Sequence, residues 1–568
     1  MNPFGIDFGT TNSVLAQWNG RSVDVLPIDS PPAAWEAMGF DKVMPSVIGI
    51  EPSGATRFGW HGKQMDGNKL EAVKRLFATE EFVEIGGHST SVEEAAALLF
   101  GHIRSASPGL TVDRAVVTIP ANSRGLARFR TKLCAGLAGI EVQALLNEPT
   151  AAAMAYSVDA TRDQNVLVFD WGGGTLDVTV LETIEGVFIE RASKGIPRSG
   201  GIDLDGAFGQ AVLDALPVRP SWSPVQQAQF RLEIERAKIL LSTQDEVNMR
   251  LPDGRYFPVT RAMFTKSIRS YLDEARRPIE QCLADLSISP DSIDQLVMVG
   301  GSSKIPAART MVSELLGREP AGGCDPMTAV AQGAAIASAI LLGQLDKDFF
   351  VATEHALGTV IHDDHQRASF SVLIPRNHQL PAKATDTYNP AVQGQKEVRI
   401  QVIEGDPDKG IDHEDNVILR EWKIAVDPDL SIMENAFTIT YEYNVDGILH
   451  IVVTEIRTGK VLLRDDVSWG VTKDRSKLVE LAKRVSTTID NGSVNGSGAR
   501  HAAVRPADPE VAALTTKARS KVVPFVDDEE ASRIEAICAD LESATGAGVD
   551  ECKEALSSAL RPYAYLLV

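Results

Sequence analysis

The first 344 residues alternate between two hydrophobic patterns. Short apolar runs such as Val166–Phe169 and Gln295–Val299 lie beside glycine turns and predict buried strands. Phe230–Leu241 has helical spacing, and Ala329–Leu342 is rich in small apolar residues, which predicts a closely packed helix. Strands that alternate with helices indicate an α/β domain over residues 1–344.

Capping residues mark the start of one helix in this region. Ser91-Val-Glu-Glu94 has the spacing of a capping box, in which a serine and a glutamate satisfy backbone donors. Apolar residues with helical spacing follow as far as Ile103. The next apolar run, Val112–Ile119, predicts a strand that ends at Pro120.

The pattern changes after a short segment, residues 345–355, that we interpret as an interdomain linker. Val398–Val402 and Phe437–Tyr443 alternate between apolar and polar side chains, which predicts strands with one buried face. Asp446-Gly447 and Thr458-Gly459 predict turns between strands. We therefore expect antiparallel hairpins that form a compact β-sandwich over residues 356–470.

The last part of the chain, residues 471–568, has helical patterns interrupted by a polar stretch. Asp490–Gly498 is rich in glycine, serine and asparagine, which predicts a flexible linker at residues 490–507. Asp508-Pro509 predicts a helix start, with the aspartate as cap and the proline in the first turn. Another helix is predicted from Asp527, with Glu530 at its third position.

Two glycine turns, each tied to an aspartate, carry the most informative chemistry. Asp7–Thr11 and Asp170–Asp177 each join two apolar runs, which predicts a strand–turn–strand hairpin twice. A glycine turn exposes backbone N–H groups that bind anionic oxygens, and aspartates can hold a hydrated Mg²⁺ that bridges phosphates. Two ordinary β-turns are the alternative interpretation. The matched pair favours two facing hairpins that clamp one nucleoside triphosphate.

Composition and charge narrow the class of protein. The 568 residues are 44% hydrophobic and 23% charged, as in ordinary soluble proteins, and the net charge is −21. This charge argues against nucleic acid and anionic membranes as partners, because both require a basic face. Five scattered cysteines without a Cys-x-x-Cys pair predict free thiols in a reducing compartment.

The expected location is the cytoplasm. The first strand is predicted from about residue 4, which leaves no space for a signal peptide. No apolar run reaches the roughly 18 residues that a membrane span needs. We also expect the protein to be a monomer.

Several ordered motifs resemble those of the seventy-kilodalton heat-shock chaperones, the DnaK-like group of the actin and sugar-kinase ATPase superfamily. Gly5–Ser13 and Asp170–Asp177 resemble its two phosphate loops, and Asn147–Ala153 resembles its connecting helix. Glu235–Ser242 and Gly300–Pro306 resemble its two adenosine-binding segments. The resemblance covers nearly all of residues 1–470. It implies a duplicated actin-like (ribonuclease H-like) α/β ATPase domain, a β-sandwich and a short α-helical lid.

The resemblance also implies catalytic residues. Lys74 matches the family lysine beside the γ-phosphate, where a cation stabilises developing charge. A solvated helix lysine is the alternative, since neighbouring Arg75 is equally basic. Glu148 and Asp177 would position or deprotonate the attacking water, and Thr175 completes the implied catalytic set.

Cofactor binding is implied in the same way. ATP or ADP and Mg²⁺ are the expected cofactors, with Asp7 and Asp170 holding Mg²⁺ through its water shell. The implied phosphate-binding residues are Gly9, Thr10, Thr11, Asn12, Gly172, Gly173, Gly174 and Thr175, with Gly200 and Gly201 beside them.

Residues that match the family's adenosine site come from two segments. Glu235, Lys238 and Ser242 have the spacing of one helical face, for which an exposed polar stripe is the alternative. The second set is Gly300, Gly301, Ser302, Lys304 and Asp325. Lys304 stands where the family usually has arginine, which stacks on adenine better than lysine does, so weaker nucleotide affinity is expected.

The β-rich part aligns less tightly with the family's peptide groove. Such a groove holds an extended peptide by main-chain hydrogen bonds and one apolar pocket, with Val398 at its base. Val398 and Ile400 could instead be plain sandwich core. The implied peptide-binding residues are Gly358, Thr359, Tyr388, Asn389, Ala391, Val398 and Ile400.

Four residues resemble positions that couple the two halves of the family. Pro120 and Arg128 match positions that relay the nucleotide state to the linker. Phe349 and Phe350 follow Asp348 where the family has an aspartate beside a leucine run. The acidic and then apolar pattern predicts that the linker docks onto the ATPase domain.

The resemblance implies slow ATP hydrolysis coupled to capture and release of unfolded or extended polypeptide. The implied partners are a J-domain co-chaperone and a nucleotide-exchange factor. A sugar kinase or an actin-like filament protein would not explain the β-rich part. A nucleotide-gated regulator of one dedicated protein partner is the main alternative, favoured by the interrupted lid. The short lid, and an end at Tyr565–Val568 without an acidic tail, indicate a divergent prokaryotic member.

Overall fold

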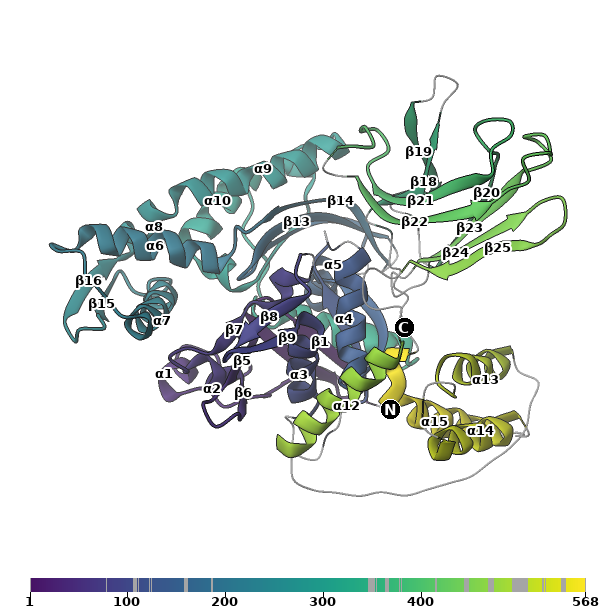
Figure 1. Ribbon diagram of the computed structural model, residues 1–568. Helices are drawn as coiled ribbons and strands as arrows, with labels where there is room; N and C mark the ends of the chain where they lie inside the picture. The colour runs from purple at the N-terminus through teal and green to yellow at the C-terminus, as the bar shows by residue number, and fades with distance from the viewer. Residues whose placement is uncertain are drawn as a thin grey trace.

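The chain forms two α/β lobes, a pair of β-sheets beside them, and a group of C-terminal helices (Figure 1). The mixed α/β architecture predicted from the hydrophobic pattern is confirmed at this level. This computed structural model describes residues 2–566 apart from residues 78, 106–109, 111, 122, 124, 158–161, 185–186, 346–352, 354, 363–366, 377, 379–380, 414–415, 444–448, 468–474, 493–508, 524–525, 527 and 543–547.

The first lobe is built on a six-stranded sheet. Its order is β11-β10-β1-β2-β3, with β4 beside β2. β1 and β2 form an antiparallel hairpin, while β10 runs parallel to both β1 and β11. The strands are β1 (Phe4–Phe8), β2 (Asn12–Trp18), β3 (Val23–Leu26), β4 (Met44–Pro45), β10 (Arg114–Ile119) and β11 (Glu141–Asn147).

The second lobe repeats this plan in a four-stranded sheet of order β14-β13-β12-β17. β12, β13 and β14 are antiparallel neighbours, and β17 is parallel to β12 as β10 is to β1. The repeated order is the duplication that the two glycine hairpins predict. The strands are β12 (Gln164–Trp171), β13 (Thr175–Ile184), β14 (Val187–Pro197) and β17 (Gln295–Val299).

Two helices of small residues pack closely at the centre of the molecule. A Cβ atom on Gly333 of α11 (Ala329–Leu341) would lie 1.7 Å from Ala151 O of α5 (Glu148–Ser157). This contact requires glycine because no side chain fits between the two backbones. The alanine-rich sequence of α11 therefore serves a close helix–helix contact, as its small-residue pattern predicts.

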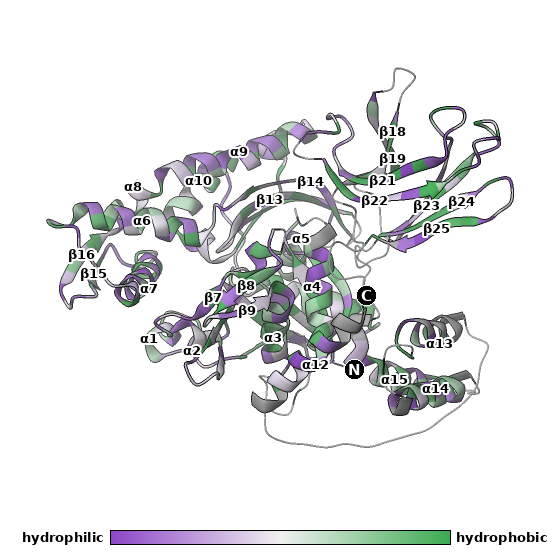
Figure 2. Cartoon of the chain, in the orientation of Figure 1, coloured by the Kyte–Doolittle hydropathy of each residue, from purple (hydrophilic) through white to green (hydrophobic). Residues whose placement is uncertain are grey.

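Longer helices cover the sheets with one apolar face. α3 (Val92–Ser105) and α4 (Gly125–Leu137) pack against the first sheet, and Ser91 Oγ accepts from Glu94 N at 3.1 Å at the predicted helix start. α9 (Arg269–Leu286) is amphipathic, and Figure 2 shows hydrophobic and hydrophilic residues mixed along it. Its buried residues include Leu272 and Ile279.

The two lobes contain further strands and helices. Near the first lobe they are α1 (Ala33–Glu36), β5 (Val47–Ile50), β6 (Thr56–Phe58), α2 (Gly59–Lys63), β7 (Lys69–Glu71), η1 (Val73–Leu76), β8 (Phe82–Ile85) and β9 (His88–Ser91). Near the second they are α6 (Gly201–Ala215), α7 (Pro224–Leu240), β15 (Glu246–Arg250), β16 (Tyr256–Thr260), α8 (Arg261–Ser267), η2 (Pro290–Ser292), η3 (Gly301–Lys304) and α10 (Pro306–Leu316).

Element boundaries differ from the sequence predictions by a few residues. The helix predicted from Phe230 begins at Pro224, where Ser223 Oγ accepts from Gln226 N at 3.3 Å. The strand predicted from Val112 begins at Arg114. Within the described parts of the chain, no helix has both the length and the apolarity that crossing a membrane requires.

The β-rich part consists of two four-stranded antiparallel sheets, as the alternating pattern predicts. Their orders are β19-β18-β21-β22 and β20-β23-β24-β25. Thr458-Gly459 forms a predicted turn, whereas Asp446-Gly447 lies outside the described residues. The strands are β18 (Ala356–His362), β19 (Ala368–Ile374), β20 (Ala382–Tyr388), β21 (Glu397–Gly405), β22 (Val417–Ala425), β23 (Phe437–Tyr443), β24 (Leu449–Glu455) and β25 (Val461–Asp466).

The C-terminal helices lie beside the first lobe and away from the β-sheets of residues 356–466 (Figure 1). Arg484 of α12 bonds to Glu94 of α3 at 3.1 Å, and Arg561 bonds to Asp113 at 2.7 Å. α12 extends to Gly492, three residues into the segment predicted as a linker. The helices are α12 (Arg475–Gly492), α13 (Pro509–Lys521), α14 (Asp528–Glu542) and α15 (Gly548–Leu560), followed by η5 (Arg561–Leu566).

Candidate active site

The two glycine turns face each other across a narrow gap. A strand–turn–strand hairpin is present at both, between β1 and β2 and between β12 and β13. A Cβ atom on Gly173 would lie 2.1 Å from Thr11 Oγ1, and one on Gly174 would lie 2.6 Å from Thr10 Oγ1. Glycine permits this approach because it has no side chain, and residues of both turns line the same small space.

A cavity of about 80 Å³ lies between the turns. The Oδ1 atom of Asn12 on its wall is buried and accepts no hydrogen bond from the described residues. A bound ligand could supply the missing donor. The lining residues that sequence analysis singled out are Asp7, Gly9, Thr10, Thr11, Asn12, Lys74, Pro120, Glu148, Asp170, Gly172, Gly173, Gly174, Thr175, Gly300 and Gly301.

Lys74 and Glu148 form an ion pair at the edge of this cavity. Lys74 Nζ donates to Glu148 Oε1 at 2.6 Å, and the two side chains are 9% and 13% exposed. Lys74 comes from η1 and Glu148 begins α5, so two distant segments meet here. The interpretation of Lys74 as a solvated surface lysine is therefore wrong.

Carboxylates crowd around this single ammonium group. Burial raises the pKa of Asp7 to about 7, and Glu148 adds to the rise while Lys74 opposes it. Burial also raises the pKa of Asp170, with further contributions from Glu148, Asp177 and Asp7. The excess of negative charge would be relieved by a cation.

The donor chemistry of Asp7 and Asp170 fits a hydrated Mg²⁺. Carboxylate oxygens are the hard ligands that Mg²⁺ prefers, and the ion usually keeps several of its waters. In the part of the chain that the structure describes, no three Asp, Glu, His or Cys side chains are grouped as ligands of a bare ion.

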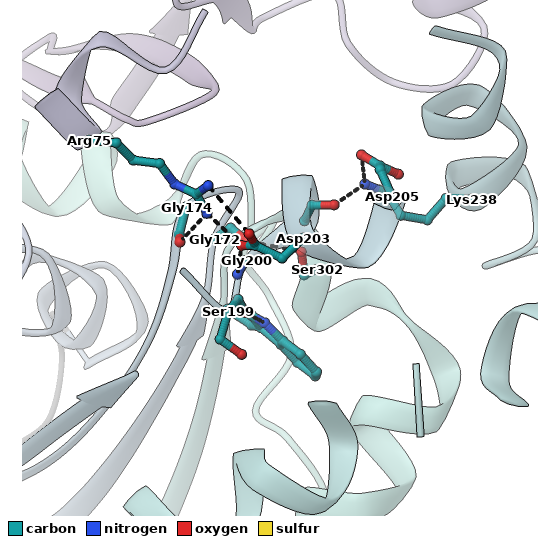
Figure 3. Close-up of polar contacts among 11 residues, drawn as sticks. Arg75, Gly172, Gly174, Ser199, Gly200, Asp203, Asp205, Lys238 and Ser302 are labelled. Carbon is teal, nitrogen blue, oxygen red and sulfur yellow. Dashed lines mark hydrogen bonds and ion pairs between the residues drawn. The ribbon is translucent and has the colours of Figure 1, made fainter. Parts of the chain in front are cut away.

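Arg75, which follows Lys74 in η1, reaches toward Gly174 and Asp203 of the second lobe (Figure 3). Its guanidinium donates to Gly174 O at 2.6 Å and to Asp203 Oδ2 at 2.5 Å. The same carboxylate oxygen accepts from Gly200 N at 2.9 Å at the start of α6. Lys74 and Arg75 therefore have different partners although both are basic. Gly200 supports the turn and does not line either of the two cavities described here.

A larger cavity of about 790 Å³ shares part of its lining with the small one and extends toward α7. It has the depth to accept a nucleoside beyond the phosphates, since ligand pockets are commonly about 300–1,000 Å³. The predicted adenosine-site residues that line it are Gly201, Glu235, Lys238, Ser242, Gly301, Ser302 and Lys304.

Glu235 and Lys238 are held by ion pairs on the cleft side of α7. Lys63 Nζ of the first lobe donates to Glu235 Oε1 at 2.7 Å. Burial alone would raise the pKa of Glu235, but Lys63 and Lys238 hold that pKa below its usual range. Lys238 Nζ donates to Asp205 Oδ2 at 2.8 Å (Figure 3). An exposed polar stripe is therefore the wrong interpretation of these two residues.

Lys304 lines the larger cavity and forms an ion pair with Asp325. The Lys304 Nζ to Asp325 Oδ1 distance is 2.7 Å, and the side chains are 37% and 43% exposed. Asp325 lines neither of the two cavities. The structure therefore places Asp325 as the partner of Lys304.

The other predicted site and coupling residues are spread around the cavities. Asp177 is buried opposite Asp170 in the β12–β13 hairpin and lines neither cavity. Arg128 is buried on α4, and its guanidinium donates to Asn147 Oδ1 at 3.1 Å. Phe349 and Phe350 lie outside the described residues.

The predicted peptide-binding residues lie on adjacent parts of the β-rich region. Gly358 and Thr359 are on β18, Tyr388 ends β20, and Asn389 and Ala391 follow it. Val398 and Ile400 on β21 are 9% and 2% exposed and belong to the hydrophobic core. Their burial agrees with the sandwich-core alternative, and the groove stays a prediction.

Comparison with known proteins identifies the family. The chain matches the family described as Hsp70 protein over residues 81–563. It belongs to the Hsp70 family. Chaperone protein DnaK of Thermosipho melanesiensis is 32% identical over 84% of this chain and 83% of the relative. DnaK of Thermotoga maritima is 33% identical over 86% of this chain and 85% of the relative. DnaK of Thermus thermophilus is 31% identical over 84% of this chain and 83% of the relative.

Membership of the Hsp70 family confirms the resemblance on which the sequence interpretation rests. The protein is an ATP-dependent chaperone concerned with protein folding. A nucleotide-gated regulator of one partner is not favoured by these similarities. Hsp70 proteins bind ATP or ADP with Mg²⁺, which agrees with the carboxylates beside the facing turns.

Sequence analysis missed four charged residues that hold the Hsp70 cleft together. Asp203 had a local signal, because an acidic residue three positions after Gly200 at a helix start can cap it. Lys63 had none, since its partner Glu235 is 172 positions away. Arg75 and Asp205 likewise bond across segments that only the fold brings together.

Proposed function

We propose that this Hsp70 chain hydrolyses ATP between its glycine turns and uses the nucleotide cycle to capture and release extended polypeptide. The observation that carries the proposal is the Lys74–Glu148 pair at 2.6 Å beside the two facing turns. A cation, a carboxylate and backbone donors around one small cavity are the groups that phosphoryl transfer to water needs.

The phosphates would lie in the cavity of about 80 Å³. Backbone N–H groups of both turns, with the hydroxyls of Thr10, Thr11 and Thr175, would donate to their oxygens. Asp7 and Asp170 would hold hydrated Mg²⁺, which neutralises phosphate charge when bound.

Lys74, Glu148 and Asp177 would carry the hydrolytic step. Glu148, which lines the small cavity, would orient the attacking water and accept its proton, and Asp177, buried opposite Asp170 outside the lining, would assist it. Lys74 would stabilise the charge that develops on the γ-phosphate oxygens, and its bond with Glu148 fixes both groups before the nucleotide arrives. The products are ADP and phosphate.

The adenosine would occupy the larger cavity beside α7. Glu235, Lys238 and Ser242 would contact ribose and adenine from one wall, with Gly301 and Ser302 on the other. Asp325 engages Lys304, so that ammonium is less available to the base. This pairing supports the expectation of weaker nucleotide affinity.

Peptide binding would depend on the β-rich part and its linker. ATP would favour a docked state that exchanges peptide quickly, and ADP an undocked state that holds it, so the nucleotide shifts populations. A J-domain co-chaperone and a nucleotide-exchange factor are the partners we expect, with a monomeric protein in the cytoplasm.

Release of a fluorescent apolar peptide tests this proposal. We expect faster dissociation after ATP addition than after ADP addition, with the difference abolished in Asp170→Asn, which removes a carboxylate from the Mg²⁺ site. Equal dissociation in both nucleotides would contradict nucleotide-controlled release. Binding of one partner protein but no generic peptide would favour the dedicated regulator instead.

A further inference from the structure

A buried carboxylate on β14 has no role in the chemistry proposed above. Glu190 is 7% exposed, although it carries an ionisable group. Its Oε1 atom accepts from Thr150 Oγ1 at 2.6 Å and from Asn147 Nδ2 at 3.0 Å. Burying a carboxylate costs free energy unless hydrogen bonds replace its contacts with water, so these two bonds allow Glu190 to be buried.

Both partners of Glu190 lie next to the active site. Asn147 immediately precedes Glu148, and Thr150 follows it by two residues in the first turn of α5. Glu190 therefore binds the chain on both sides of the glutamate that pairs with Lys74 at 2.6 Å. The position of the Glu148 carboxylate depends on where this first turn is held.

The same network reaches the predicted relay arginine. Asn147 Oδ1 accepts from an Arg128 guanidinium at 3.1 Å, while its Nδ2 donates to Glu190. The Asn147 amide thus joins α4 of the first lobe to β14 of the second. A shift of Arg128 would act on Asn147, whose other end is fixed by Glu190.

β14 also adjoins the β-rich part. Figure 1 shows β14 of the second lobe extending toward the β-rich part, and Phe188 shares one hydrophobic cluster with Leu373 and Ile374 of β19. Arg376 follows these residues. Burial raises the pKa of Glu190, while its hydrogen bonds, Arg128 and Arg376 oppose the rise.

We propose that Glu190 is a positioning residue that holds Glu148 for hydrolysis and conveys docking of the β-rich part, through Arg376, to the catalytic turn. The inference rests on the proposed ATPase function. Glu190 touches neither of the two cavities that would bind the nucleotide, so it acts through Asn147 and Thr150. Because Glu190 carries a negative charge, it is attracted to Arg128 and Arg376, and a shift of either arginine would act on it. A neutral residue could hold α5 by hydrogen bonds but would lack this attraction.

Two substitutions separate positioning from charge. Glu190→Ala removes both hydrogen bonds, and we expect single-turnover hydrolysis at saturating ATP to fall about tenfold, since small misplacements of catalytic groups are costly. ATP affinity should change less than twofold. Glu190→Gln keeps an acceptor oxygen, so it should recover at least half of the basal rate but lose most stimulation by peptide.

Matched variants complete the test. Arg376→Ala should leave basal hydrolysis unchanged and lose most peptide stimulation. The controls are Glu182→Ala, a glutamate on β13 paired with Arg191, and Arg399→Ala, an exposed arginine paired with Glu421. Both should match the parent protein in both measurements.

The outcomes distinguish the two proposals. A parent protein without ATPase activity would overturn the proposed function itself. If the parent is active and peptide-stimulated, unchanged turnover per folded molecule in Glu190→Ala would overturn the positioning role. Full peptide stimulation in Glu190→Gln or Arg376→Ala would overturn the link to the β-rich part, and Glu190→Gln keeps that test available if Glu190→Ala does not fold.

Discussion

At the residue scale, the ammonium of Lys74 is central to the site. Among the described residues that line the small cavity, Lys74 is the only basic one. Its positive charge opposes the rise in the pKa of Asp7 and of Asp170. Arg75, its neighbour, is occupied by Asp203 and Gly174 O. The two adjacent cations therefore have different partners, Lys74 at the small cavity and Arg75 across the cleft.

Replacing Lys74 with alanine should suppress hydrolysis while ATP still binds, because both glycine turns remain. Loss of one contact aimed at the transition state typically costs about 2.7–4 kcal/mol, or a hundredfold to a thousandfold in rate. Single-turnover hydrolysis and ATP titration measure the two effects. Lys266→Ala, at an exposed position on α8, is the control. Parental turnover in Lys74→Ala would show that the assignment is wrong.

The raised pKa of Asp7 predicts how stability depends on pH without nucleotide. The folded-state pKa of about 7 lies above the unfolded value of about 3.9, so the folded protein binds the proton more tightly. The free energy of unfolding should therefore fall as pH rises from about 4 to 7. Asp170, whose pKa is also raised, contributes with the same sign.

Urea unfolding between pH 5 and pH 8 measures this dependence. Asp7→Asn should flatten the decline and be more stable than the parent at pH 8, since it removes a buried charge. Stability that increases over this interval, in the parent without nucleotide, would contradict the electrostatic description of the site.

At the element scale, two short hairpins and two helix starts bring the site together. The β1–β2 and β12–β13 turns line the small cavity, η1 supplies Lys74, and α5 supplies Glu148. The buried bonds of Glu190 to Asn147 and Thr150 fix the first turn of α5 in this assembly.

The linker is the element on which coupling should depend most. Replacing Phe349 and Phe350 with serine should leave basal hydrolysis intact and abolish stimulation by peptide, because the apolar side chains would no longer support docking. ATPase rates with and without peptide measure both properties. A double variant that is stimulated as strongly as the parent would remove the linker from the mechanism.

Much of this arrangement was predictable from local sequence. Glycine turns tied to Asp7 and Asp170, the Ser91 cap and the alternation at Val398–Val402 each carry their own signal over a few residues. The ion pair of Lys63 with Glu235 was not predictable, because its partners lie on different lobes. The position of the C-terminal helices was missed for the same reason, since their contacts are made with distant elements.

At the scale of the whole molecule, the C-terminal helices contact the first lobe. Arg484 bonds to Glu94, Ile489 packs over Gly101, and Arg561 bonds to Asp113. Buried residues of α12 to α15 join the same hydrophobic cluster as α3 and α4. In this arrangement the helices support the lobe, and they lie away from the sheets where peptide would bind (Figure 1).

Deleting residues 493–568 should therefore change peptide dissociation in ADP only slightly, while it lowers the thermal midpoint of the first lobe. The deletion would expose apolar surface on α4 to water, which lowers the free energy of unfolding of the first lobe. Fluorescent-peptide release and a thermal melt measure the two effects. Arg561→Ala, which removes two partly exposed ion pairs with Asp113 and Glu554, should cost only about 1 kcal/mol.

A normal clamping lid gives the opposite pattern. In that case the truncated protein would release peptide about a hundredfold faster than the full-length protein, because differences in affinity between related complexes lie mostly in the dissociation rate. Such a result, with an unchanged thermal midpoint, would contradict the supporting role of the C-terminal helices.

The ATPase rate with and without an extended apolar peptide tests the central claim most directly. A chaperone whose nucleotide and peptide sites are coupled should hydrolyse ATP slowly alone and several-fold faster with saturating peptide, and Lys74→Ala should be inactive in both conditions. A rate that peptide does not change, measured in protein shown to bind both ATP and peptide, would contradict the account.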